Sequence, residues 1–455
     1  MASYNKIPLE IEKIDTKYRR IQTKLPVPES LPLIEQCEKY EPRSMQGQPP
    51  IVWDRAEGFQ VYDKWGNMWL DWSSGVLITN AGHSHPKIMQ ALREQLDKGL
   101  ISSYVFYHEQ RAELVKLLTE NAPEGLDKVF LLTTGSEATE NTIKLARTYG
   151  LEKGGKAKNV IVSFNNAFHG RTLGAQLAGG APALKEWIVN KDKDFINVPF
   201  PDGFFQEDRS FDVFLKTLAD LGIEHKNVAG IITESYQGAG PFFLPKEYAQ
   251  KLQDFCREND ALMIYDEVQA GFGRSGKWFT FEHYDVKPDM IACGKGISSS
   301  LPIAAVIGRN DVMDLYPPGS MTSTHSGSPL PVASAVANIK ALKEEKLTEN
   351  AAALEPVLME GLKKIQQKHP QQIGFISGKG LVAGMQIVKP NTKESDNEMS
   401  YKINEKCFQK GLLMFAPVGV GGMCIKISPP LNITEEALRE GIQVLDEVCD
   451  ELLMG

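Results

Sequence analysis

One lysine and one pair of acids stand where short apolar runs of the sequence end. Asp266 and Glu267 close the run at 261–268, and Lys295 follows the run DMIACG between two glycines. A carboxylate at the end of a buried strand is costly unless a cation lies nearby. A lysine beside apolar strands tends to have a lowered pKa, which suits a nucleophile that forms Schiff bases and carries protons. Taken alone, the acids could instead cap a helix or form an ion pair, and the lysine could be a solvated loop residue.

The segment TTGSEATENTIKLART has the pattern of a helix start that binds an anion. Thr134 to Glu137 fit the capping box T-x-x-E, and apolar positions at helical spacing follow. Gly135 and Ser136 would then offer free N–H groups at the positive end of the helix dipole. An ordinary capped helix fits the same pattern.

A third segment, SFNNAFHGRTLGA, supplies an aromatic ring and a cation. Phe168 and His169 precede a glycine and Arg171. Phe168 could stack on a planar ring, and Arg171 could hold a carboxylate in a bidentate fork. A core phenylalanine and a surface salt bridge are the alternatives. Taken together, the anion cup, aromatic ring, buried acid and lysine predict a pyridoxal-phosphate site.

A glycine-rich stretch at 271–277 offers a competing interpretation. Gly271, Gly273 and Gly276 fit G-x-G-x-x-G, and the stretch nearly fits the phosphate-binding loop. The G-x-G-x-x-G pattern needs a packing helix after it, and the following KWFTFEHYDVKP does not have the pattern of one. The phosphate-binding loop needs Ser or Thr where this chain has Trp278. We expect a surface turn, and a nucleotide-binding protein is kept as a remote alternative.

The elements that would position these residues alternate between apolar runs and helical stretches. Most runs are continuously apolar, as in strands buried on both faces, and strands separated by helices predict a mostly parallel α/β sheet. Ligands of such sheets bind beyond the carboxyl ends of the strands, where the residues above lie. The runs lie at 128–133, 159–164, 228–235, 261–268, 289–294 and 302–308.

The flanking regions differ in style from this central pattern. An arm rich in proline precedes an alternating hairpin, GFQVYDKWGNMWLDW, and long helices with the strand pair GFISGKGLVAGMQIV follow the last run. We therefore expect residues 1–74 to form an arm and hairpin of a small domain, 75–335 a large α/β domain, and 336–455 the rest of the smaller α+β domain.

Composition narrows the class of protein. The 455 residues carry a net charge of −8, so no nucleic-acid partner is expected. None of the six cysteines forms a C-x-x-C pair, and neither a metal site nor a disulfide framework is expected. The first twenty residues do not have the pattern of a secretory signal or organelle presequence, and no run would span a membrane, so we expect a cytoplasmic protein.

At this point the chain resembles the class III aminotransferases, pyridoxal-phosphate enzymes of fold type I, nearest their 4-aminobutyrate aminotransferase branch. The resemblance covers nearly the whole chain. It is densest at TTGSEATENTIKLAR, FHGRT, TESYQGAGP, DEVQAGFGRSGKWF, KPDMIACGKGI and STHSGSP. It implies a large domain with a mostly parallel seven-stranded sheet flanked by helices, a smaller α+β domain, and a homodimer with active sites at the subunit interface. Assembly into a tetramer stays open.

The resemblance also implies roles for single residues. Lys295 forms the Schiff base with the cofactor, and Asp266 pairs with the pyridine nitrogen. Val268 and Phe168 pack on the two ring faces, and Thr324 reaches the phosphate of the neighbouring subunit's cofactor. Further cofactor contacts are Gly135, Ser136, His169, Glu234 and Gln269, and the implied substrate contacts are Arg171, Val76 and Lys426.

Two positions depart from the 4-aminobutyrate enzymes. Ala239 stands where those enzymes have a glutamate, and Lys426 where they have the arginine that binds an alpha-carboxylate. Lys426 could hold a carboxylate or sulfonate, or could be structural and face solvent on an edge strand. We expect transfer from a small omega-amino acid, such as 4-aminobutyrate, beta-alanine or a taurine-like amine, to a 2-oxo acid. A racemase or epimerase on the same fold is the alternative.

Overall fold

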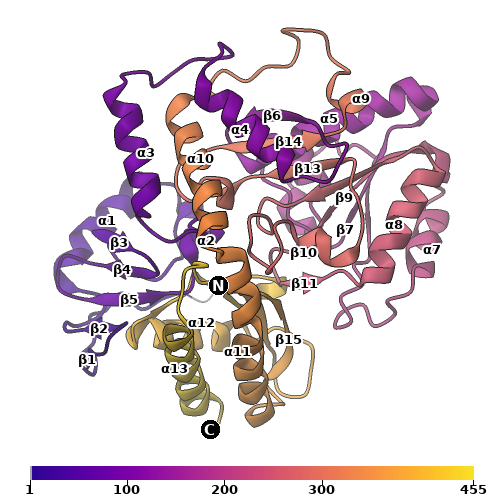
Figure 1. Ribbon diagram of the computed structural model, residues 1–455. Coiled ribbons are helices and arrows are strands. Elements are labelled where there is room, and N and C mark those ends of the chain that lie inside the picture. Colours follow the sequence, from indigo (N-terminus) through magenta and orange to yellow (C-terminus); the bar gives the residue numbers. More distant parts are fainter. Residues whose placement is uncertain (1–2, 455) are drawn as a thin grey trace. The chain divides into compact units, whose positions relative to one another are not determined.

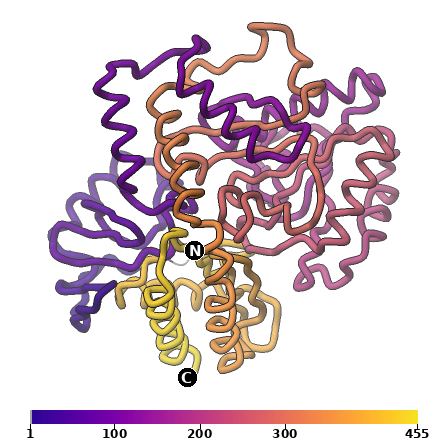
Figure 2. The backbone as a smooth tube through the Cα atoms, in the orientation of Figure 1, coloured from indigo at the N-terminus to yellow at the C-terminus, as the bar shows by residue number. Residues whose placement is uncertain are grey.

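The computed structural model describes residues 3–454, which divide into two compact units (Figure 1). The central unit is Pro86–Glu349, and the terminal unit comprises the described parts of Met1–His85 and Asn350–Gly455. In Figure 2 the terminal unit takes its chain from the indigo and the yellow ends of the colour bar, so both ends of the sequence build it. The sequence-based domain limits at 74/75 and 335/336 stay a prediction.

The central unit is built on a seven-stranded sheet. All six apolar runs that were predicted as strands lie in it, and a seventh strand, Phe195–Val198, was not recognised from the sequence. The strands are β6 (Lys128–Leu132), β7 (Val160–Phe164), β8 (Phe195–Val198), β9 (Val228–Glu234), β12 (Leu262–Asp266), β13 (Met290–Cys293) and β14 (Ala304–Gly308).

Strand direction confirms the predicted fold class. The order is β6-β14-β13-β12-β9-β7-β8, and only β14 runs antiparallel to its neighbours. The remaining pairs along the sheet are parallel. The carboxyl ends of β7, β9, β12 and β13 therefore meet at one edge of the sheet, which is where ligands of open α/β sheets bind.

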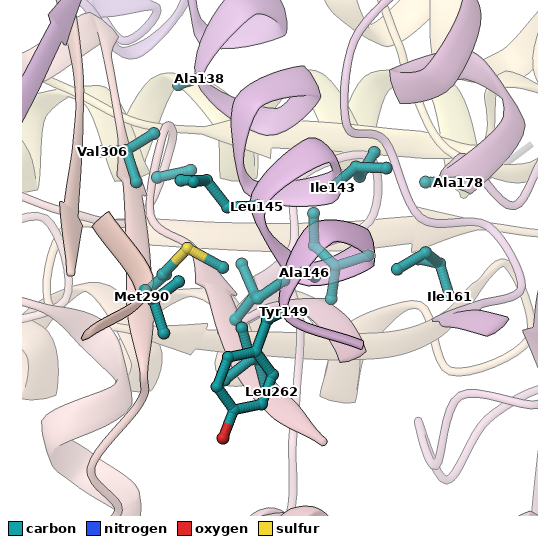
Figure 3. Packing of buried hydrophobic residues seen from close by; sticks show 14 of the residues in the cluster. Ala138, Ile143, Leu145, Ala146, Tyr149, Ile161, Ala178, Leu262, Met290 and Val306 are labelled. Atoms are coloured by element: carbon teal, nitrogen blue, oxygen red, sulfur yellow. The ribbon is translucent and has the colours of Figure 1, made fainter. Parts of the chain in front are cut away.

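Helices cover both faces of this sheet. Ile264 belongs to the apolar cluster that includes Leu145 and Ala146 of α5 (Gly135–Gly154). Figure 3 shows these two α5 residues within the cluster. The adjacent Met263 points the other way, with its sulfur 3.9 Å from that of Cys256 on α8 (Lys246–Glu258). Because successive strand residues face opposite sides, α5 and α8 lie on opposite faces. The other α-helices are α3 (Pro86–Asp97), α4 (Glu109–Glu120), α6 (Leu173–Ala178), α7 (Asp212–Asp220), α8 (Lys246–Glu258), α9 (Asn310–Met313) and α10 (Pro329–Glu344).

The terminal unit contains two sheets. The hairpin predicted around residues 58–72 is present, since β4 pairs antiparallel with β5, and β17 from the distant C-terminal part adds to β5 in parallel. The predicted strand pair is β15 and β16, with β18 beside β16. The strands are β1 (Ile14–Asp15), β2 (Arg20–Ile21), β3 (Arg55–Glu57), β4 (Gln60–Tyr62), β5 (Met68–Asp71), β15 (Ile373–Lys379), β16 (Val382–Ile387), β17 (Leu412–Leu413) and β18 (Cys424–Ile427).

Helix α12 (Asn397–Gln409) contacts strands of both sheets, and α13 (Glu435–Leu453) packs on α12. Thr434 caps the start of the C-terminal helix α13, because its side chain accepts a hydrogen bond from the Ala437 N–H. In residues 3–454 no helix combines the length and the apolar character needed to cross a membrane. The α-helices are α1 (Leu31–Tyr40), α2 (Ser74–Leu77), α11 (Leu347–Lys368), which starts at the end of the central unit, α12 (Asn397–Gln409) and α13 (Glu435–Leu453).

Candidate active site at the carboxyl ends of the strands

One pocket of the central unit collects most of the residues that the sequence singled out. It lies at the carboxyl ends of β9, β12 and β13 and encloses about 580 Å³, including its opening to solvent. Lys295 and Asp266 both line it, so the pair on which the cofactor interpretation depends shares a single cavity. The other lining residues are Thr134, Gly135, Ser136, Phe168, His169, Gly170, Glu234, Tyr236, Val268 and Gln269.

Lys295 sits on a sharp turn directly after β13. Its own backbone is left-handed, with φ of 42°, a conformation that is strained for a residue with a side chain. The preceding Gly294 allows close packing, because a Cβ there would lie 3.1 Å from Cγ1 of Val268. Burial lowers the pKa of Lys295, while the negative charges of Asp266 and Glu234 only partly oppose that shift. The neutral, nucleophilic amine is therefore more accessible than in a surface lysine.

Asp266 ends β12 and is held by a buried chain of hydrogen bonds. Its Oδ2 lies 2.8 Å from Nδ1 of His169, and its Oδ1 accepts from the Val268 N–H at 3.1 Å. The other ring nitrogen of His169 lies 3.0 Å from Oγ of Ser163. Burial acts to lower the pKa of His169, but the hydrogen bond and charge of Asp266 outweigh it and raise that pKa above its ordinary value.

Two further carboxyl groups lie close to this chain. Burial raises the pKa of Glu234 to about 7, even though its oxygens accept from the N–H groups of Phe168 at 3.0 Å and Gly238 at 2.7 Å. Burial also raises the pKa of Glu267 to about 8, against hydrogen bonds from Ser235 and from the Thr280 and Phe281 N–H groups. Glu267 does not line the pocket but ties β12 to the turn that follows it.

The start of α5 has the geometry that the predicted anion cup requires. Thr134 accepts from the Glu137 N–H, and the Glu137 side chain accepts from the N–H groups of Thr133 and Thr134, which completes a capping box. The next two N–H groups, of Gly135 and Ser136, have no acceptor among residues 3–454. Since they belong to the first turn, they cannot bond within the helix and are available to an anion in the pocket.

Arg171 lies next to this pocket. Its guanidinium carbon is 5.5 Å from the centroid of the Phe168 ring, which lines the pocket. The residue is exposed, and within residues 3–454 it makes no ion pair. An exposed, unpaired guanidinium beside a pocket is available to a carboxylate.

The remaining predicted site residues do not line the pocket. Thr324 is exposed in the loop between α9 and α10. Val76 and Lys426 belong to the terminal unit, where Val76 is 42% exposed. Lys426 lies on β18, at the edge of its sheet, yet it is only 2% exposed and its Nζ is 6.0 Å from the Phe415 ring centroid. The alternative that Lys426 faces solvent was therefore wrong. Its strand does lie at an edge of the sheet, but the side chain is covered.

Val76 lies in a strained turn of the terminal unit. Ser74, Gly75, Val76 and Leu77 all have positive φ, with 66° at Val76. Each non-glycine residue in that region costs about 1–2 kcal/mol. Asp71 fixes the start of the turn by accepting from the N–H (2.7 Å) and hydroxyl (2.6 Å) of Ser73.

The glycine-rich stretch at 271–277 forms a turn, as we expected, but the expectation of a surface turn was wrong, because residues 271–275 are buried. Gly273 and Gly276 adopt φ of 90° and 82°. Among the described residues, the next helix is the short 3₁₀ segment Thr280–Tyr284, so no packing helix opens on these glycines. The dinucleotide fingerprint therefore lacks the element that it requires.

The residues of the pocket fit pyridoxal phosphate. The free N–H pair at α5 suits its phosphate, and Phe168 and Val268 offer apolar surface for its ring. Asp266 is a buried acid for the ring nitrogen, and Lys295 is an amine of lowered pKa for the aldehyde. In the described part of the chain no cluster of His, Cys, Asp and Glu could hold a metal ion.

Sequence reasoning missed three contributors to this site. Ser163 stands inside β7 rather than after it, and Gly170 and Tyr236 carry no distinctive chemistry. The FHG sequence was a usable signal for Gly170, whose φ of 134° is open only to glycine without strain.

Comparisons with known proteins agree with the cofactor that the pocket fits. The family described as "Aminotransferase class-III" matches residues 42–449. An acetylornithine aminotransferase of Caldanaerobacter subterraneus is 33% identical over 89% of this chain and 95% of its own. A 4-aminobutyrate aminotransferase of Mycobacterium leprae is 31% identical (95% and 98%), and an alanine/serine racemase of Pyrococcus horikoshii is 32% identical (98% and 96%).

A solved structure has the same architecture. The ornithine aminotransferase of Toxoplasma gondii superposes with a TM-score of 0.83 at 26% identity, covering 94% of this chain and 96% of that one. That structure is described as having partial occupancy of pyridoxal phosphate at its active site.

Proposed function

Because this chain belongs to the class III aminotransferases, enzymes that use pyridoxal phosphate, we propose that it moves an amino group from a small omega-amino acid to a 2-oxo acid in a ping-pong reaction. The observation that carries this proposal is the pairing of Lys295 and Asp266 in one pocket with an unpaired Arg171 beside it. Candidate donors are 4-aminobutyrate, beta-alanine and taurine-like amines.

Each side chain has a distinct task in this reaction. Pyridoxal phosphate, when bound, supplies the electron sink that lets the substrate carbon next to nitrogen lose a proton. Lys295 holds the cofactor and then, as a free amine of lowered pKa, takes that proton and returns it at a second carbon. Asp266, oriented by His169, keeps a negative charge beside the ring nitrogen. The two free N–H groups at α5 hold the phosphate.

Arg171 selects the substrate in this proposal. A guanidinium binds a carboxylate through two parallel hydrogen bonds, and here it would hold the end of the substrate that is distant from the reacting amine. The absence of the glutamate and arginine at Ala239 and Lys426 leaves the acceptor open, so pyruvate is a candidate as well as 2-oxoglutarate. The similarity to an acetylornithine aminotransferase adds acetylated diamino acids to the donors that a screen should include.

We propose a homodimer on the basis of an exposed apolar segment between α3 and α4. Tyr107 is 99% exposed and Phe106 75%, a cost that covering by a second copy would remove. The exposed Thr324 would then reach the partner's phosphate. The apolar segment also includes Leu100, Ile101, Tyr104 and Val105, and the exposed Leu96 precedes it at the end of α3. A tetramer and a cytoplasmic location stay predictions.

A racemase is the second candidate, favoured by the similarity to the alanine/serine racemase over 98% of this chain. It would use the same lysine and acid but return the proton to the same carbon. One enantiomer of alanine or serine, incubated without an oxo acid, separates the two functions. Steady inversion with no carbonyl product would refute the aminotransferase.

The deciding experiment is a screen of donors against the coloured, cofactor-loaded enzyme. A donor is recognised by loss of the aldehyde absorbance and release of one carbonyl product per site, and an acceptor by return of the colour. We expect an omega-amino acid to be the fastest donor. A screen in which only alpha-amino acids react would refute the proposed substrate class.

A further inference from the structure

We infer that Glu140 is a positioning residue that holds the segment bearing Arg171 and thereby sets which length of omega-amino acid the enzyme prefers. This inference rests on the proposed function, since it requires Arg171 to bind the distal carboxylate. Glu140 lies in the second turn of α5 and does not line the pocket.

The first observation is an unusual cap on α6. The N-cap residue Thr172 makes no capping hydrogen bond with its own side chain. Instead, Oε1 of Glu140 accepts from the N–H groups of Gly174 at 2.7 Å and Ala175 at 3.1 Å. These are donors that a short helix leaves unsatisfied at its start. A carboxylate from a distant part of the chain therefore fixes the helix that follows Arg171.

The second observation is that α5 also holds the residues before α6. The Thr139 hydroxyl donates to the His169 carbonyl at 2.6 Å. The Arg171 N–H donates to Oγ of Ser136 at 3.4 Å. The contact is close enough to exclude side chains, because a Cβ at Gly170 would clash with Ser136 and one at Gly174 would clash with Glu140. The segment 169–175 is thus held by α5 on both sides of Arg171.

This arrangement couples two anion sites. The first turn of α5 offers the Gly135 and Ser136 N–H groups to the phosphate, and the second turn fixes the segment of Arg171 through Glu140. The separation between the bound phosphate and the guanidinium then depends on a single helix. Since the phosphate and Lys295 define where the substrate amine reacts, that separation selects the amine-to-carboxylate length. A misplacement of about 1 Å in such a site can cost about 100-fold in rate.

The test compares Glu140→Ala and Glu140→Gln with Glu152→Gln, a matched control at an exposed position of α5. The readouts are kcat and KM for omega-amino acids of three, four and five carbons, the inhibition constant of pentanoate, and the affinity of the apoenzyme for the cofactor. Glu140→Ala should lower kcat/KM for the preferred length by about 10-fold, mainly through KM, and flatten the preference among the three lengths.

The other variants make the expected pattern specific. Glu140→Gln should keep most of the preference, because its amide oxygen can still accept from Gly174 and Ala175. Glu152→Gln should behave as the unaltered enzyme. Hydrogen exchange of the Gly174 and Ala175 amides in the apoenzyme should accelerate in Glu140→Ala, while cofactor affinity stays within about threefold. If Glu140→Ala fails to fold, Glu140→Asp, which shortens the side chain, carries the same comparison.

The inference and the proposed function can fail separately. If no omega-amino acid acts as a donor for the unaltered enzyme, the proposed function fails, and if Arg171→Ala leaves the preference for omega-amino acids and the inhibition by pentanoate unchanged, the role of Arg171 fails. If Arg171→Ala removes both but Glu140→Ala lowers kcat/KM equally for every length, the positioning role of Glu140 is refuted. Adding Glu140→Ala to Arg171→Ala should have no further effect on length preference, and a further loss would also refute it.

Discussion

Replacement of Gly135 by alanine should weaken cofactor binding because of one close contact. Gly135 is the first residue of α5, and a Cβ there would lie 2.7 Å from Cγ1 and 3.1 Å from Cγ2 of Val268. Alanine by itself would favour the helix by up to about 1 kcal/mol. Overpacking of this kind costs about 1–3 kcal/mol, so the side chain of Val268 must move.

The shift of Val268 should be measurable as lost cofactor affinity. Val268 lines the pocket, so strain of about 1–3 kcal/mol in the loaded enzyme corresponds to about 5- to 150-fold weaker binding. Titration of the apoenzyme with pyridoxal phosphate, followed by absorbance, gives the dissociation constant. The α5 cup itself should be unaffected, since only a methyl group is added outside it.

A second substitution provides the refuting result. In Gly135→Ala with Val268→Ala, both Cγ atoms are absent, and the new Cβ lies 3.5 Å from the Cβ of residue 268, an ordinary contact. The double variant should bind the cofactor more tightly than the sum of the two single effects predicts. Strict additivity of the two changes would refute the steric explanation.

Three other predictions follow from local features of the fold. Burial raises the pKa of Glu234 to about 7 from its usual 4.5, so the stability that this group gives the apoenzyme is complete below pH 4.5 and is lost as the pH rises through 7. Glu234→Gln should therefore flatten the pH dependence of the unfolding temperature between these two pH values. An unchanged slope would contradict the raised pKa. Burial lowers the pKa of Lys295, so acetic anhydride labelling of that amine in the apoenzyme, followed by mass spectrometry, should reach half its plateau below pH 10.5 and not at or above it. Val76→Gly removes the strain of a β-branched residue at φ of 66°, which is worth about 1–2 kcal/mol, and should therefore raise the unfolding temperature of the protein. A lower unfolding temperature would show that the turn is not strained.

Much of the sheet was predictable because its strands are buried on both faces. The six runs are continuously apolar, and the chemistry-bearing residues follow them directly, as the carboxyl-end rule requires. The strand Phe195–Val198 was missed because it has only four residues between Asp194 and Pro199 and pairs with β7 alone. A short edge strand of this kind is decided by its neighbour rather than by its own pattern.

Parts of the site depend on contacts that no local pattern contains. Ser163 reaches His169 only because it faces one side of β7, and the burial of that side is set by the rest of the unit. The left-handed turn at 74–77 has a single glycine, so its conformation follows from Asp71 and the surrounding packing. Lys426 shows the same limit, since an edge strand does not by itself determine whether its side chains are covered.

The charges at the strand ends explain how one acid can serve the cofactor. Asp266 and Glu234 are register partners on adjacent parallel strands, so two ionised carboxylates would lie side by side in a buried site. Burial and the charge of Asp266 both raise the pKa of Glu234, whereas Asp266 has His169 as a hydrogen-bond partner. Below about pH 7 Glu234 therefore holds a proton while Asp266 keeps its partner. The charge of His169 lowers the pKa of Glu234, so replacing His169 by a neutral residue of similar size should raise that pKa further, and a pH titration of the bound cofactor's absorbance should show a midpoint shifted to higher pH.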